Sequence, residues 1–592
     1  MTIAVVVLGA RGLELARKLA AGLDGAQVHG LAGRADGADT VFDDTMAHLR
    51  ALHRDQVAIV GICAAGILIR AVAPVLDGKQ QDAPVVALAE DGSVAVPLIG
   101  GHHGANRLAR RLAALTGGSA AITNAGDLRF GFALDDPPAG WRIANPALVK
   151  PVAAALLSGE GARLEGTAPW LAGAPWRDQA EYRVRVTAWR DGADDRTLVI
   201  HPAILAVGVG CERGTDPAEL RNLVAETLAA AGLAPGAVAA IATIELKMDE
   251  PAMHEAARAL DAPLRFFTAA ELEAEVLRLQ NPSDIVFAAT GCHGVAEGAA
   301  LALAGPDSVL VAAKRKSARA TCAVAQAIAP IDPAECGRPR GSLMVVGIGP
   351  GDAAWRSPEA TAALEAADII IGYRLYLDLL EGLSPDAERR EYDLGQESER
   401  VRDALTLAGE GKRIALVCSG DAGIYALASL VFETIDHAAG PAWRRVAVEI
   451  VPGISAMQAA AARAGAPLGH DFCAISLSDL LTPRAVIIRR LEAAASGDFV
   501  TALYNPRSQK RRDLLVRARD ILAANRPPST PVVIARNLGR ADESVVLATL
   551  ATLDLETVDM LTILIVGNRQ TRLLPGGEGA RVYTPRGYEG KR

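Results

Sequence analysis

The sequence is poor in aromatic residues and carries no excess of positive charge. Phe, Trp and Tyr make up 4% of its 592 residues, although 50% of all residues are hydrophobic. The formal net charge is −8, so the chain lacks the basic field that attracts nucleic acid or an anionic membrane. We therefore expect neither as a partner. A small acidic molecule is an acceptable ligand, because a local basic cleft can lie on an acidic protein.

Disulfide and membrane signals are also missing. The seven cysteines include no Cys-x-x-Cys pair, and their odd number is poor material for a disulfide framework. A secretory signal carries positive charge before its apolar run. The apolar start of this chain has no such charge before it. No apolar run approaches the roughly 18 residues of a membrane span. These absences predict a cytoplasmic protein whose thiols stay reduced.

Three segments open with a β-branched run that leads into glycines and then into an amphipathic helical pattern. They begin at residues 2–9, 203–210 and 342–351. Strand and helix patterns alternate after each, which is typical of α/β domains with several parallel or mixed sheets covered by helices. A chain of this length should form roughly two to four domains. We predict regions at 1–140, 141–202 (connecting), 203–328, 329–341 (linker), 342–575 and 576–592 (tail).

The third segment ends in a glycine-rich turn that matches neither of two common nucleotide motifs. Its sequence, LMVVGIGPGD, closes a buried strand at Gly347, and Asp352 is its last residue. A dinucleotide fold requires Gly at the position of Asp352, and a P-loop requires Gly-Lys-Ser/Thr. The glycines let the backbone turn tightly and approach a ligand closely. A plain strand end explains a Gly-Pro-Gly turn equally well when it is taken alone.

Further motifs follow this turn in order. A second buried strand leads to Ser419-Gly420-Asp421, and Tyr425 is expected one turn into the next helix. A third strand leads to a Pro-Gly turn and to a helix that Ser455 is expected to cap. The segments SLSDLLTP at 476–483 and YNPRS at 504–508 come next.

This ordered set resembles the tetrapyrrole methylase family, and within it the precorrin-3B C17-methyltransferases. The resemblance covers 341–572 and implies a two-lobed α/β fold with S-adenosylmethionine as cofactor. The donor-binding positions that it implies are Gly349, Pro350, Gly351, Asp352, Gly420, Asp421 and Ile424. The branch usually has Trp where this chain has Arg484. That departure keeps open a methylase that acts at another ring position or on a noncorrin substrate.

The substrate that this resemblance implies carries many acetate and propionate carboxylates. Arg side chains clamp carboxylates bidentately, so a basic cluster beside an aromatic residue is a candidate for substrate binding. The candidates are Tyr504, Asn505, Arg507, Lys510 and Arg511. A solvated helix face explains the same basic cluster. The resemblance to the C17 branch implies that methylation is coupled to ring contraction, so His470 and Asp479 are candidates to assist proton movement.

The first region carries the run GGHHGAN at 100–106, between a strand and a helix. Backbone N–H groups there could approach an anionic ligand, but a plain turn capped by Asn106 explains the run as well. The region resembles the cobalt-precorrin-5A hydrolase family, which opens a lactone on the macrocycle. The matching positions are Gly66, Arg70, Pro74, Lys79, Asp91, Gly92, Gly101, His102 and Asn106. The family's His-x-Gly-Gly-Ala-Asn run is one glycine shorter here, and His102 or His103 is a candidate general base.

The middle region resembles the C-terminal domain of the same hydrolase family. Its segment CERG at 211–214 precedes a helix that Thr215 or Asp216 is expected to cap. Cys292 and His293 are adjacent, but without a second pair of ligands they predict no metal site. The candidates for substrate contact are Glu245, Lys247 and Glu297.

Together these resemblances predict a bifunctional enzyme of corrin synthesis, with hydrolase-like regions fused to a C17-methyltransferase. The resemblance also implies a homodimer formed through the methylase domain. Alternatively, residues 1–330 are a noncatalytic carrier for an unstable tetrapyrrole. Turnover of a lactone-bearing corrinoid by that region would exclude the carrier. Whether the substrate already contains cobalt stays open.

Overall fold

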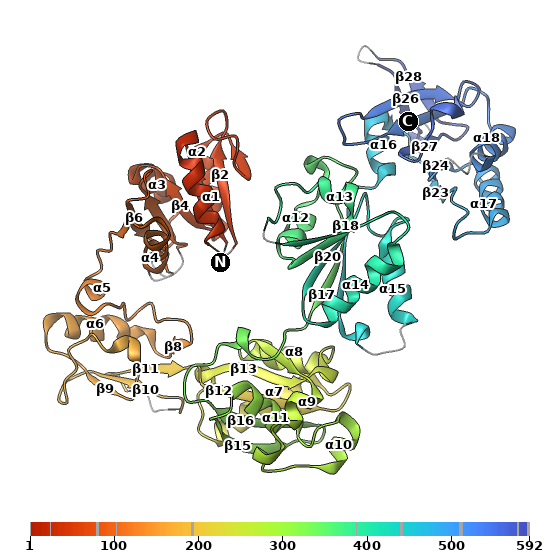
Figure 1. Ribbon diagram of the computed structural model, residues 1–592. Helices are drawn as coiled ribbons and strands as arrows, with labels where there is room; N and C mark the ends of the chain where they lie inside the picture. The colour runs from red at the N-terminus through yellow and green to blue at the C-terminus, as the bar shows by residue number, and fades with distance from the viewer. Residues whose placement is uncertain are drawn as a thin grey trace. The chain divides into compact units, whose positions relative to one another are not determined.

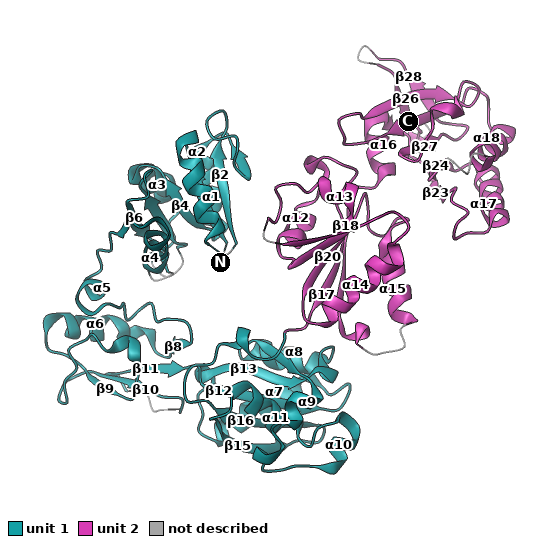
Figure 2. Cartoon of the chain, in the orientation of Figure 1, with its two compact units in different colours: residues 1–338 teal, residues 339–592 magenta. Residues whose placement is uncertain are grey.

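The computed structural model describes residues 2–23, 25–78, 82–101, 104–190, 194–385, 387–437, 442–507, 513–576 and 579–588. The chain forms two compact units, unit 1 at 1–338 and unit 2 at 339–592, which Figure 2 distinguishes by colour. Within the described ranges, each unit contains three sheets. The predicted class, α/β with several sheets covered by helices, is confirmed.

The first sheet of unit 1 has the order β3-β2-β1-β4-β5-β6-β7 and is parallel except for the β5–β6 pair. Its strands are β1 (Ile3–Val7), β2 (Ala26–Leu31), β3 (Thr40–Phe42), β4 (Ala58–Ile62), β5 (Val85–Leu88), β6 (Val94–Ile99) and β7 (Ser119–Ala120). Val5 packs in one core with Leu19, whereas Val6 packs in another with Leu49. Alternate residues of β1 therefore point to opposite faces, and both faces are buried.

Different helices cover these two faces (Figure 1). One face is covered by α1 (Leu13–Ala21) and α4 (Ala105–Thr116), and the other by α2 (Thr45–Arg54) and α3 (Ala65–Val72). The helix α2 begins after Asp44, whose carboxylate accepts hydrogen bonds from the N–H groups of Met46 and Ala47. Such a cap satisfies donors that the first helical turn leaves free.

Two further sheets complete unit 1. The four-stranded sheet β8-β11-β10-β9 lies in the region where the sequence predicted a connection. Its elements are α5 (Ala125–Phe130), β8 (Trp141–Ile143), α6 (Val149–Ser158), β9 (Arg163–Glu165), β10 (Arg183–Val186) and β11 (Thr197–Pro202). The five-stranded sheet has the order β14-β13-β12-β16-β15. Its elements are β12 (Leu205–Cys211), α7 (Pro217–Ala230), β13 (Val238–Ile244), α8 (Pro251–Ala259), β14 (Leu264–Phe267), α9 (Ala269–Glu273), α10 (Asp284–Thr290), α11 (Val295–Ala304), β15 (Val309–Lys316) and β16 (Ala320–Gln326).

No single helix in the described ranges is long and apolar enough to cross a bilayer, although α10 and α11 reach that length together as a bent pair.

Unit 2 begins with a fully parallel sheet of order β19-β18-β20-β17-β21. Its elements are β17 (Ser342–Gly347), α12 (Pro358–Glu365), β18 (Ile369–Tyr373), α13 (Arg374–Asp378), β19 (Glu388–Tyr392), α14 (Glu397–Gly409), β20 (Arg413–Cys418), α15 (Leu427–Asp436) and β21 (Ala447–Val451). Val345 packs with Val401 and Val431 on one face, and Val346 packs with Leu364 on the other. The glycine turn after β17 therefore lies at the carboxyl edge of a parallel sheet, where α/β proteins usually bind ligands.

The second part of unit 2 is a mixed sheet of order β23-β24-β27-β25-β26, with a small sheet β22-β29-β28 beside it. Its elements are α16 (Ala456–Ala464), β22 (Gly465–Ala466), β23 (Phe472–Ser476), α17 (Arg484–Ser496), β24 (Val500–Tyr504), α18 (Asp513–Asn525), β25 (Pro531–Arg536), β26 (Ser544–Thr549), β27 (Thr562–Val566), β28 (Arg572–Leu574) and β29 (Arg581–Tyr583). One face packs against α17 and α18, and the other packs against α16. Ser455 caps α16 through a reciprocal pair with Gln458, as predicted.

Candidate functional site

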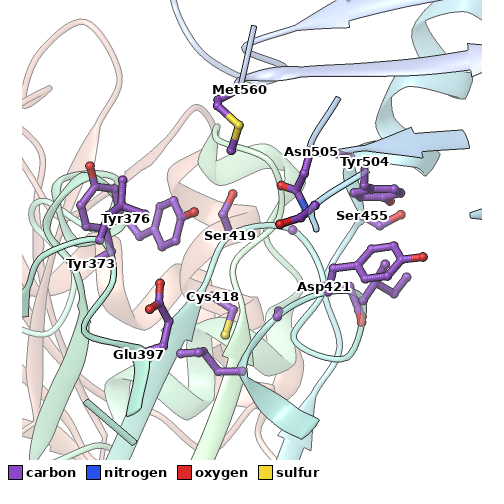
Figure 3. Close-up of a pocket in the computed structure, with 18 of the residues that line it drawn as sticks. Tyr373, Tyr376, Glu397, Cys418, Ser419, Asp421, Ser455, Tyr504, Asn505 and Met560 are labelled. Carbon is purple, nitrogen blue, oxygen red and sulfur yellow. The ribbon is translucent and has the colours of Figure 1, made fainter. Parts of the chain in front are cut away.

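Unit 2 contains a cavity of about 890 Å³ that is lined by both of its larger sheets. Tyr373 and Cys418 reach it from the ends of β18 and β20, whereas Tyr504 reaches it from the end of β24. Figure 3 shows Tyr373, Tyr376 and Glu397 at one end of the cavity. Asp421, Ser455, Tyr504 and Asn505 lie at the other end. We call these the Tyr376 end and the Asp421 end.

The wall at the Asp421 end is made from backbone packed directly on backbone. Gly349 and Gly420 exchange two hydrogen bonds, with N···O distances of 3.1 and 2.7 Å. A Cβ atom on Gly347 would lie 2.7 Å from the carbonyl oxygen of Gly420, and one on Gly453 would lie 2.6 Å from that of Gly347. Three strand ends therefore meet only because these positions carry no side chain. The glycine motifs of the sequence are explained by this contact.

Asp421 holds two of these turns together. One carboxylate oxygen accepts a hydrogen bond from the N–H of Gly423 at 2.8 Å, and the other accepts from the N–H of Gly453 at 3.1 Å. The side chain thus links the turn after β20 to the turn after β21. Asp421 therefore fixes the shape of the two turns and also lines the cavity wall.

Two tyrosines form the adjoining part of the wall. The ring centroids of Tyr425 and Tyr504 are 5.2 Å apart. The Tyr425 hydroxyl donates to the carbonyl of Ala474 at 2.9 Å, and the Tyr504 hydroxyl accepts from the N–H of Met457 at 3.2 Å. Burial raises the pKa of Tyr504 above its usual value. Tyr425 precedes α15 in a left-handed conformation (φ +53°), and the prediction that it lies inside that helix is wrong.

An unsatisfied amide also faces the cavity. Asn537 is 7% exposed and lines the wall. Its Nδ2 donates to Asp542 at 2.5 Å, but its buried Oδ1 has no hydrogen-bond partner among the described residues. A buried acceptor without a partner is costly. It is therefore free to accept a hydrogen bond from a bound ligand.

The cavity wall contains two arginines that the sequence interpretation missed. Arg400 lies on α14 and Arg540 follows β25, and both line the cavity. Arg400 shares the buried face of α14 with Val401, Ala404 and Ala408. An arginine on the apolar stripe of a helical pattern was the available signal, since charged residues are seldom buried without a reason.

Six of the predicted unit 2 residues line the cavity. They are Pro350, Gly420, Asp421, Ile424, Tyr504 and Asn505. Gly349 and Gly351 lie behind the wall, where Gly351 packs against the backbone of Gly539. Asp352 is exposed and caps the short 3-10 helix η10 (Ala353–Trp355) by accepting from the N–H of Ala354 at 2.7 Å.

The predicted basic cluster is arranged differently from the expectation. Arg507 is mostly buried, pairs with Glu556 at 2.7 Å and donates to the carbonyl of Leu555. Its guanidinium is therefore committed to protein groups outside the cavity lining. Lys510 and Arg511 lie outside the described residues. Arg484 begins α17, pairs with Asp513 and does not line the cavity.

The two candidates for proton movement lie at opposite ends of β23. His470 precedes the strand and accepts from the N–H of Asp471 at 2.8 Å through Nδ1, whereas the cavity lies beyond the strand's last residue. Five residues of strand span about 16 Å, so His470 is remote from the wall. Asp479 is not itself among the lining residues, although its neighbours Ser478 and Leu480 both line the cavity.

In unit 1 the structure gives partial information on the predicted hydrolase-like site. Lys79, His102 and His103 lie outside the described residues. Asn106 does not cap α4, because it is the second residue of that helix and Gly104 occupies the cap position. Its Nδ2 donates to Asp127 at 3.0 Å, and Asp127 also pairs with Arg110. This buried network ties α4 to α5.

In the middle region, the structure shows the contacts of Glu297, His293 and Asp216. Glu297 is 1% exposed, and its carboxylate accepts hydrogen bonds from the N–H groups of Gln280, Asn281 and Lys314. Its role is therefore to hold these backbone segments in place. His293 pairs with Glu273 at 2.8 Å. Asp216 caps α7, as one of the two alternatives predicted.

Family models match three parts of the chain. The model described as "Tetrapyrrole (Corrin/Porphyrin) Methylases" matches residues 342–554. The models described as "Cobalamin synthesis G N-terminal" and "Cobalamin synthesis G C-terminus" match residues 47–127 and 205–325.

Individual proteins match unit 2 over nearly their whole length. The probable cobalt-factor III C(17)-methyltransferase of Salmonella typhimurium is 45% identical over 246 residues, which is 42% of this chain and 99% of that protein. The precorrin-3B C(17)-methyltransferase of Sinorhizobium sp is 47% identical over 252 residues, which is 42% of this chain and 98% of that protein. The crystal structure of the methyltransferase CobJ aligns with a TM-score of 0.39 at 41% identity, and covers 41% of this chain and 100% of that chain.

Proposed function

Because this chain belongs to the tetrapyrrole (corrin/porphyrin) methylases, we propose that unit 2 transfers a methyl group from S-adenosylmethionine to C17 of a corrin precursor. The observation that carries the proposal is the identity of 45–47% with two C17-methyltransferases across 98–99% of their lengths. The precursor is precorrin-3B or its cobalt-containing counterpart. The same reaction contracts the macrocycle.

The Asp421 end is proposed as the donor site. S-adenosylmethionine supplies an electrophilic methyl group, and transfer requires alignment of donor and acceptor more than an acid–base pair. The turns at Pro350, Gly420 and Asp421 bring backbone groups to the wall without obstructing side chains. Asn537 lines the same cavity, and its buried Oδ1 has no hydrogen-bond partner among the described residues.

The rest of the cavity suits a large molecule with apolar faces and an acidic periphery. Its rim carries exposed apolar side chains: Leu394 is 70% exposed, Leu480 75% and Leu481 98%. Exposed apolar groups gathered around a cavity favour an apolar ligand surface. Tetrapyrrole rings present such a surface on both faces.

Two further roles follow from the same proposal. Asp479, rather than His470, is the better candidate to move a proton during ring contraction, because its neighbours on both sides line the cavity. Methylation at another ring position is disfavoured, because Arg484 pairs with Asp513 and is not among the residues that line the cavity.

We also propose that the protein forms a homodimer through unit 2, and sedimentation equilibrium of the full chain tests this.

For unit 1 we propose hydrolysis of a cobalt-precorrin-5A-type lactone, supported by the two "Cobalamin synthesis G" matches at 47–127 and 205–325. The noncatalytic carrier is the second candidate, favoured by the shortened glycine run beside His103. Full-length protein and its His102→Ala/His103→Ala variant are incubated with the lactone-bearing corrinoid. Release of a two-carbon aldehyde by the wild type alone supports the hydrolase. Retained binding without aldehyde supports the carrier.

The methyltransferase proposal is tested with labelled S-adenosylmethionine and either metal-free precorrin-3B or its cobalt form. We expect the product to gain one methyl group and to show the spectrum of a contracted ring. The preferred substrate then identifies the metal state. Donor binding without transfer to either substrate would contradict C17 methylation.

A further inference from the structure

Arg400 is a buried cation whose donors are not all used within the protein. It is 5% exposed and lines the cavity. Its Nε and one terminal nitrogen are fully buried and have no hydrogen-bond partner among the described residues. An unsatisfied buried charge is strongly destabilising. Arg400 therefore resembles a site prepared for an anion.

Arg540 provides a second guanidinium on the wall of the same cavity. Its Nε is buried without a partner in the described part of the chain. Burial raises the pKa of Tyr376, and the positive charges of Arg540 and Arg400 oppose that rise. The charges of both cations therefore act on the Tyr376 hydroxyl, Arg400 from α14 and Arg540 from the segment after β25.

Among the described residues, no carboxylate forms an ion pair with Arg400 or Arg540. Glu397 lies one helical turn before Arg400 and lines the same end (Figure 3). Its carboxylate accepts from the N–H of Gly395 at 3.3 Å, and no ion pair joins it to Arg400 or Arg540 in the described ranges. Other arginines of unit 2 do have carboxylate partners, such as Arg390 with Asp403 at 3.0 Å. The two cavity arginines thus differ from the ordinary surface pairs.

We propose that Arg400 binds a peripheral carboxylate of the tetrapyrrole, with Arg540 as a second cation on the wall of the same cavity. This inference rests on the proposed function and names its substrate contact. Guanidinium forks match carboxylates bidentately. The methionine part of the donor also carries a carboxylate, but the donor site proposed above is at the Asp421 end, and Figure 3 shows that end across the cavity from Tyr376. The substrate carboxylate is therefore assigned to the arginines.

The test measures equilibrium binding to full-length Arg400→Met, Arg400→Lys and Arg540→Met. The probes are uroporphyrin III, which is a stable tetrapyrrole octacarboxylate, S-adenosylhomocysteine, and 5′-methylthioadenosine, which lacks the donor's carboxylate. We expect Arg400→Met to weaken uroporphyrin binding on the order of 10- to 100-fold, because a charge-assisted contact is lost. Lys keeps the charge but loses the fork, so Arg400→Lys should lie between. Binding of both adenosine probes should stay within about twofold of wild type.

A matched control is Arg445→Met. Arg445 is a buried arginine of unit 2 (8% exposed) that does not line the cavity. The affinity of this variant shows how far the loss of a buried guanidinium by itself weakens binding, and circular dichroism checks that each variant is folded.

If Arg400→Met binds uroporphyrin III as the control does, the inference is overturned. It is equally overturned if S-adenosylhomocysteine weakens while 5′-methylthioadenosine does not, because the donor's carboxylate would then occupy the arginines. Failure of the wild type to methylate, with these binding effects intact, would instead count against the proposed function.

Discussion

Asp421 has a role that a single substitution can isolate. Its two carboxylate oxygens accept hydrogen bonds from Gly423 and Gly453, and Asp421→Asn replaces one acceptor with a donor that faces an N–H. We expect S-adenosylhomocysteine affinity to fall about tenfold and the free energy of unfolding to fall by about 1–2 kcal/mol. Calorimetric titration and thermal melting measure the two effects.

The control for Asp421 is Asp403→Asn. That carboxylate pairs with Arg390 and Tyr392, and Asp403 does not line the cavity. It should alter stability while leaving donor affinity unchanged. Equal loss of affinity in both variants would mean that Asp421 acts only through stability.

A buried histidine makes unit 1 sensitive to acid. Burial, assisted by His48 at 2.9 Å, lowers the pKa of His29 from 6.5 to about 4. Below pH 6.5, His29 binds a proton in the unfolded chain but stays neutral in the folded chain. The folded state therefore loses stability as the pH falls toward 4. The full effect is about 3 kcal/mol.

Hydrogen exchange of β1 and β2 peptides in the full chain, corrected for intrinsic rates, measures this loss. His29→Gln should flatten the pH dependence of protection between pH 6.5 and 4, while peptides of unit 2 serve as the internal reference. An unchanged slope in the variant would show that another group titrates.

At the scale of elements, the meeting of three strand ends depends on glycine. A Cβ atom on Gly453 would overlap the carbonyl oxygen of Gly420 and lie 2.6 Å from that of Gly347. Gly453→Ala must separate the ends of β17, β20 and β21. We expect at least a tenfold loss of S-adenosylhomocysteine affinity and about 2–3 kcal/mol of destabilisation.

Gly409→Ala is the matched comparison, because a Cβ atom there meets nothing within 4 Å and Gly409 is the last residue of α14. Alanine in a helix is favoured over glycine by about 0.5–1 kcal/mol. This variant should melt at the wild-type temperature or slightly above and bind the donor normally. Similar behaviour of the two variants would refute the backbone-contact explanation.

At the scale of the whole molecule, unit 2 is expected to work alone. The C17-methyltransferases that it matches are almost fully covered by the alignment, and residues 339–592 form one compact unit. A chain of these residues should bind S-adenosylhomocysteine with wild-type affinity and methylate with kcat/KM within about threefold of the full protein. A much larger loss would reveal that unit 1 contributes to the methyl transfer, as a substrate carrier would.

Much of the fold was accessible from the sequence. The β-branched runs that lead into glycines predicted strands, and β1, β12 and β17 occupy those places. Capping by Ser455 followed from side-chain chemistry within one turn. The four-stranded sheet between 141 and 202 was not predicted, because its strands are short and its turns are rich in Pro and Gly. The roles of the candidate site residues stay predictions.

What the sequence by itself determined is local: which segments form strands, where glycine permits close approach, and which ordered motifs mark the family. Tertiary structure decided which side chains meet. It paired Arg507 with Glu556, made Asp352 the cap of a short 3-10 helix, and brought Arg400 and Arg540 to the wall of one cavity. The physical reason is that turns and caps depend on neighbours within a few residues. A binding wall instead depends on the packing of sheets whose contributing residues lie far apart in the chain.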